Sequence, residues 1–143
     1  MKKLILASAL ATTIAVFGLW GSAGAAYAHP KLHQWYAQEG GKQSLKAIGK
    51  DIAAVSTAGN DENTSALGSA CQSLEGDIQI AQALKPIPSS SLQRFWATVL
   101  SDYSHGATEC INGTNDESAS ELDQSASDFT SGSSVLAHLN NQL

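Results

Sequence analysis

Two cysteines, Cys71 and Cys110, constrain the fold of this chain more than any other feature, because both fall in segments with a helical pattern. The cysteines are even in number and no CxxC or CxxH spacing is present, which favours a disulfide over a metal site. A tight turn between the two helices would place Cys71 opposite Ser104, well short of Cys110. At 1.5 Å per residue the mismatch is about 9 Å, whereas bonded cysteines need Cα atoms within about 7 Å. The disulfide therefore requires the second helix to begin about two turns beyond the end of the first.

The segment Lys85-Pro86-Ile87-Pro88 lies between these two helices and can supply that offset. A residue that precedes proline disfavours the α region, so the first helix must stop near Leu84. In extended form, residues 85–90 can reach up to roughly 20 Å. We therefore expect this connector to run on past the first helix rather than turn back at once.

Apolar residues recur at helical spacing along the rest of the chain, and alternating strand patterns are nearly absent. Helices are predicted over 30–39, about 42–57, 63–84 and 91–112, and again from a capping box at Thr114 and Glu117 through Leu139. The stretch 130–134 is a poor helix former, at which the last helix is expected to kink or break. The predicted fold is all-α, a four-helix up-down bundle with a short extra N-terminal helix, stapled by one disulfide. A less regular orthogonal array of helices is the alternative.

The first 28 residues have the layout of a secretory signal peptide. Lys2 and Lys3 form a positive start, an apolar stretch follows to Trp20, and small residues lead to the sequence Ala26-Tyr27-Ala28. Cleavage is predicted after Ala28, which leaves residues 29–143 as a single helical domain. The alternative is an uncleaved N-terminal membrane anchor.

The charge balance excludes some classes of partner. Without Lys2 and Lys3 the chain has six basic residues against thirteen acidic ones. Nucleic acids and anionic membranes are bound through basic patches, which such a chain does not provide. We therefore expect no nucleic-acid partner, and no membrane contact after the signal peptide is removed.

Known catalytic and metal-binding patterns are absent from the sequence. It contains no G-x-S-x-G, HExxH or CxxCH motif, and the four histidines outside the leader are not paired at ligand spacing. No catalytic, cofactor-binding or metal-binding residue is assigned, and no cofactor is expected. Asp51 and Asp77, which flank the apolar stripes of two predicted helices, are the only acid candidates for hydrolytic chemistry.

Aromatic side chains offer one further candidate site. Trp35, Tyr36, Phe95 and Trp96 could line an apolar ligand pocket. At helical spacing such residues are more often part of the core, so both interpretations remain open.

The cysteine-centred pattern resembles uncharacterised small secreted helical proteins of actinobacteria. The resemblance covers the middle third of the chain and consists of short elements at fixed spacing, namely Ala70-Cys71, Leu74, Asp77, Ala81, Pro86-Ile87-Pro88, Gln93, Trp96, Leu100, Ala107, Cys110 and Gly113. Members often carry a lipid-anchor cysteine near the signal peptide, and this chain has none. The resemblance implies secretion and a helical fold, and it implies no activity.

Together these features predict a secreted, non-enzymatic helical domain that acts by binding, at the cell envelope or outside the cell. The partner would be an unidentified protein or a small apolar ligand. One alternative is a carrier that holds a small apolar ligand in the core of the bundle. Another is a small secreted hydrolase that uses Asp51 or Asp77.

Overall fold

The structure, a computed structural model, describes residues 30–142, and its regular secondary structure within that range is entirely helical. The predicted signal peptide, residues 1–28, lies outside the described residues. The helices are α1 (Pro30–Gln38), α2 (Gly41–Asn60), α3 (Thr64–Gln82), α4 (Ser90–Asn115) and α5 (Ala119–Asn140). The all-α prediction is confirmed.

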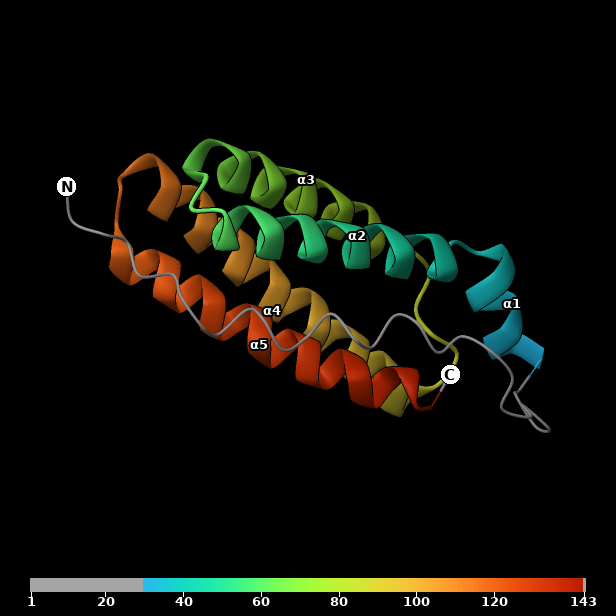
Figure 1. The fold of residues 1–143 in the computed structure, drawn as a ribbon. Helices are drawn as coiled ribbons and strands as arrows, with labels where there is room; N and C mark the ends of the chain where they lie inside the picture. Colours follow the sequence, from blue (N-terminus) through green and yellow to red (C-terminus); the bar gives the residue numbers. More distant parts are fainter. Residues whose placement is uncertain (1–29, 143) are drawn as a thin grey trace.

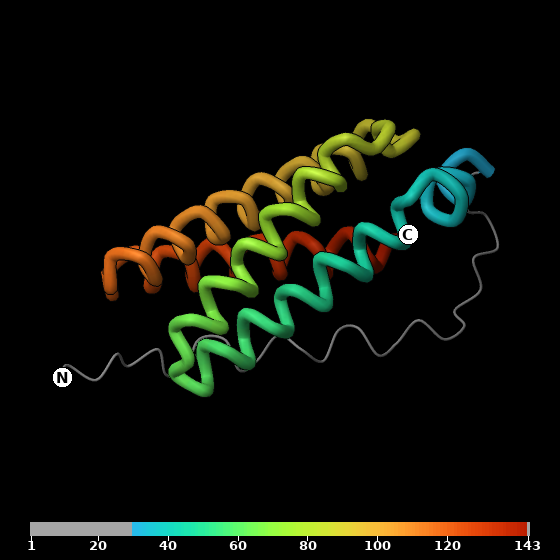
Figure 2. The backbone as a smooth tube through the Cα atoms, turned by 90° about the horizontal axis from the view of Figure 1, so that it is seen from above, coloured from blue at the N-terminus to red at the C-terminus, as the bar shows by residue number. Residues whose placement is uncertain are grey.

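The four long helices pack side by side in a helical bundle, and α1 lies across one end (Figure 1). Each long helix contacts the next one along the chain, from α2 to α5. Seen from above, α2 and α3 form one layer of the molecule and α4 and α5 lie behind them (Figure 2). The bundle therefore consists of two helical hairpins joined by the connector between α3 and α4.

The two hairpins use the same turn. The sequence Asn-Asp-Glu occurs at 60–62 after α2 and at 115–117 after α4. In both turns the glutamate, Glu62 or Glu117, has a φ of 52°, in the left-handed region that side chains rarely adopt. A matching hydrogen bond closes each turn, from Asn63 N–H to the Ala58 carbonyl (3.0 Å) and from Ser118 N–H to the Gly113 carbonyl (2.9 Å).

This turn corrects three sequence predictions. Helix α2 continues through 58–60, beyond its predicted end at about 57, and α4 continues to Asn115, beyond its predicted end at 112. The capping box assigned to Thr114 and Glu117 is wrong, because Thr114 lies inside α4 and donates to the Ile111 carbonyl. Ser118 caps α5 instead and accepts a hydrogen bond from the Glu121 N–H.

Close packing against α4 explains why α5 has no break at 130–134, contrary to expectation. Each of these helices carries an aromatic residue three positions before a glycine, Tyr103 with Gly106 on α4 and Phe129 with Gly132 on α5. Each ring packs on the other helix's glycine, so that a Cβ atom at either glycine would lie 2.7 Å from ring carbons. Gly132 therefore allows α4 and α5 to approach each other closely, and it does not end α5.

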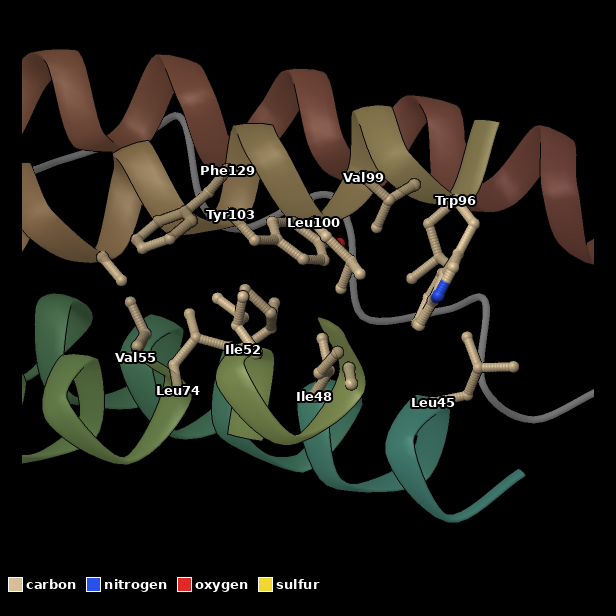
Figure 3. Packing of buried hydrophobic residues seen from close by; sticks show 14 of the residues in the cluster. Leu45, Ile48, Ile52, Val55, Leu74, Trp96, Val99, Leu100, Tyr103 and Phe129 are labelled. Atoms are coloured by element: carbon tan, nitrogen blue, oxygen red, sulfur yellow. The ribbon is translucent and has the colours of Figure 1, made fainter. Parts of the chain in front are cut away.

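The core lies between the two hairpins (Figure 3). Leu45, Ile48, Ile52 and Val55 line one side of α2, at the helical spacing predicted for them. They face buried residues that project from α4 and α5, among them Trp96, Val99, Leu100, Tyr103 and Phe129.

The disulfide joins the two hairpins and fixes their register. The sulfur atoms of Cys71 on α3 and Cys110 on α4 lie at bonding distance, and their Cα atoms are 6.2 Å apart. Because neighbouring helices rise equally per residue, this contact places Gln82, the last residue of α3, opposite Val99. The first residues of α4 therefore extend about 13 Å beyond the end of α3. The offset expected from the sequence is present.

Candidate functional site

The offset between α3 and α4 leaves a groove of about 340 Å³ at the end of α3. Cavities of a few hundred Å³ are typical of small-ligand sites. The apolar part of its wall consists of Ala81 and Leu84 from the α3 side and Trp96, Ala97 and Leu100 from α4. The polar part consists of Gln82, Lys85, Gln93, Ser101, Ser104 and His105.

Two indole rings make the wall of the groove rigid. Trp96 lines the groove but is only 3% exposed, and it meets Trp35 edge to face with ring centroids 6.1 Å apart. Trp35 is fully buried, and its Nε1–H donates to the Lys85 carbonyl at 2.7 Å. The α1 helix therefore holds the start of the connector in place.

Two further contacts order the connector. The Ile87 N–H donates to Oε1 of Gln93 at 2.7 Å, and the Ile87 side chain is buried. At the surface, Nζ of Lys85 pairs with Oε1 of Glu39 at 3.2 Å. The connector is thus fixed to both α1 and α4.

The four aromatic residues proposed from the sequence lie in three different settings. Trp35 and Trp96 both belong to the core, and Trp96 also lines the groove. Phe95 is half-buried, with its ring 4.7 Å from the ring of His138 on α5. Tyr36 is half-buried and packs against the core. Of the four, Trp96 is the residue that lines the groove.

Sequence reasoning missed the rest of the groove wall. One side of α4 carries four groove residues at helical spacing, namely Ala97, Ser101, Ser104 and His105. In the sequence this side has the pattern of an ordinary polar helix face. The available signal was the register implied by Cys71 and Cys110. That register places this side of α4 opposite the end of α3.

A much smaller void lies within the core. A void among core residues that include Val55, Leu67, Cys110 and Phe129 measures about 10 Å³. Such a void has room for about one water molecule. A ligand of the size of the groove therefore has room at the surface, beside Trp96, and not in this void.

The two acid candidates, Asp51 and Asp77, meet across the contact between α2 and α3. Asp51 is 6% exposed, and the Ser73 hydroxyl donates to its carboxylate, with both oxygens 3.2 Å away. Burial raises the pKa of Asp51 above its ordinary value, and a hydrogen bond and charge repulsion from Asp77 raise it further. Ser73 and Lys50 act on this pKa in the opposite direction.

We predict that replacing Asp51 by asparagine stabilises the protein more at pH 7 than at about pH 4. An aspartate in an unfolded chain has a pKa near 3.9, and the folded protein holds the Asp51 proton more tightly. The stability that Asp51 contributes is therefore fully present below the unfolded pKa and is lost as the pH rises through the raised folded pKa. Thermal unfolding of wild type and Asp51→Asn at the two pH values measures this difference.

The matched control for this pH test is Asp123→Asn, which alters an exposed carboxylate on α5. It should change the melting temperature by a similar small amount at both pH values. An equal effect of Asp51→Asn at pH 4 and pH 7 would contradict the prediction.

The position of the Asp51 and Asp77 pair also bears on hydrolysis. Neither residue lines the groove, and a nearly inaccessible Asp51 leaves no room for a substrate between the two carboxyl groups. Asp51 and Asp77 therefore form a polar contact that joins α2 to α3.

Three comparisons with known proteins give no relative for this chain. No family model matches the sequence, and neither a curated protein nor a solved structure is similar to it. Within residues 30–142, no three His, Cys, Asp or Glu side chains lie close enough together to hold a metal ion. No helix in the described part of the chain is long and apolar enough to cross a membrane.

Proposed function

We propose that this protein is a secreted, non-enzymatic binding protein of the cell envelope or the extracellular space, and that its site is the groove between α3 and α4. The observation that carries the proposal is the open groove of about 340 Å³ built on the buried ring of Trp96. Export rests on the signal-peptide layout of residues 1–28 and on the cysteine pair, which suits an oxidising compartment.

The proposal also includes the direction in which the four long helices run. The four long helices form an up-down bundle, and α1 is a short additional helix at one end. Support comes from the contacts between helices that follow one another in the chain, and from the short turns after α2 and α4. Such a frame keeps the groove in one shape before a ligand arrives, which lowers the entropic cost of binding.

The chemistry of the groove suits a small ligand with an apolar body. Leu84, Trp96 and Leu100 provide apolar contact area, and the serine, glutamine and histidine side chains around them provide hydrogen bonds. A small ligand is favoured over a protein partner because the groove matches ligand sites in volume.

We predict that mature protein binds decan-1-ol or decanoate in this groove and that Ala97→Trp weakens this binding at least about tenfold, since a filled groove loses its apolar contacts. Ala97 is exposed and lines the groove, so an indole there occupies the space of the ligand. Isothermal calorimetry measures the affinity of both proteins, and the combined fluorescence of Trp35 and Trp96 also reports binding in wild type.

Thr98→Trp is the matched control, because Thr98 is the exposed neighbour of Ala97 and does not line the groove. It should leave the affinity unchanged. Failure of both probes to bind wild-type protein would overturn the proposal. Native mass spectrometry of protein from its own culture medium would add the ligand's mass and show whether the chain begins at His29.

A further inference from the structure

We infer that the ligand of the groove is an organic anion, an apolar body that ends in a carboxylate or a similar acid group held by Lys85. This inference rests on the proposed function of the groove and adds the chemical class of its ligand.

The groove is elongated, and its polarity changes along its length. The α4 wall runs from Gln93 to His105, which corresponds to about 18 Å of helix. Along α4, Trp96 and Leu100 lie between Gln93 and His105, and Leu84 adds apolar surface from the end of α3. Lys85 also lines the groove, at the start of the connector. A ligand whose apolar body covers Trp96 can therefore direct its head group toward Lys85.

The charges of the groove differ from those of the chain as a whole. Acidic residues outnumber basic ones in the sequence, thirteen to eight, yet no residue that lines the groove is acidic. The ionisable side chains in its wall are those of Lys85 and His105. An anion is thus the ligand charge that this surface complements, whereas a cationic head group would meet Lys85 at close range.

Lys85 keeps the capacity to bind an acid although it already pairs with Glu39. An ammonium group has three N–H donors, and one oxygen of Glu39 lies within reach, at 3.2 Å. Lys85 lines the groove and its side chain is 74% exposed, so the ammonium group remains accessible to solvent. Glu39 competes with the ligand for this charge, and its removal should strengthen the binding of an anion.

The test compares three probes with the same ten-carbon chain and different head groups, namely decanoate, decan-1-ol and decylamine, at pH 7 and low salt. For wild type we expect decanoate to bind about two- to fivefold more tightly than decan-1-ol, the range of an exposed ion pair, and decylamine to bind most weakly. Lys85→Gln should lower the affinity for decanoate to that for decan-1-ol. Glu39→Gln should tighten decanoate binding and leave decan-1-ol binding unchanged.

Lys42→Gln is the matched control, because Lys42 is an exposed lysine on α2 that does not line the groove. It should leave the order of the three probes as in wild type. Equal affinities for all three probes would overturn the inference about the anion while leaving the proposed groove in place. Binding of none of them would overturn both.

Discussion

Reduction of the Cys71–Cys110 disulfide is expected to lower the free energy of unfolding by about 3–4 kcal/mol. The bond closes a loop with a sequence separation of 39 residues, and it restricts the unfolded chain far more than the folded one. Both cysteines are buried, so the folded helices already hold the sulfurs together. Urea denaturation followed by circular dichroism, with and without reductant, measures the difference.

A double variant, Cys71→Ala with Cys110→Ala, separates the crosslink from the packing of the sulfur atoms. It should be less stable than oxidised wild type and should not respond to reductant. Equal unfolding midpoints for oxidised and reduced wild type would show that the crosslink does not stabilise the fold.

Trp35→Ala is expected to destabilise the protein by about 3–5 kcal/mol, the range for removal of a large buried aromatic side chain. Trp35 is fully buried, packs against Trp96 and holds the Lys85 carbonyl. Its loss leaves a cavity beneath the connector and an unpaired carbonyl. The free energy of unfolding in urea gives the cost directly.

Trp35→Phe divides this cost into two parts. Phenylalanine keeps most of the ring contacts but cannot donate to the Lys85 carbonyl, and the loss of one such hydrogen bond costs about 0.5–1.5 kcal/mol. His33→Ala, an exposed change on the same helix, should have almost no effect. If Trp35→Ala were as stable as His33→Ala, α1 would not be part of the folded unit.

The parts of the fold that could be predicted from the sequence are those set by local chemistry. Asn63 caps α3 and Ser89 caps α4, since short polar side chains accept hydrogen bonds from free N–H groups at helix starts. The left-handed Gly40, with a φ of 96°, ends α1. The offset of α4 could also be predicted, because a disulfide limits the distance between the Cα atoms of its two cysteines.

The parts that could not be predicted depend on contacts between distant segments. Gly113 resembles a helix stop, yet it lies inside α4. Its lack of a side chain makes room for Leu122 instead, because a Cβ atom at this position would lie 2.8 Å from the Leu122 side chain. Asp51 and Asp77 meet only because α2 and α3 pack at one particular register. Periodicity places such residues near the edge of a stripe and does not reveal what lies opposite them.

The disulfide has a consequence for how the molecule tolerates damage to its backbone. Cys71 lies in the first hairpin and Cys110 in the second, so the two halves are linked covalently at a second point besides the connector. A protease that cut the chain between Pro86 and Pro88 would produce two fragments that stay attached and can remain folded against each other. One nick in the connector would therefore not release either half.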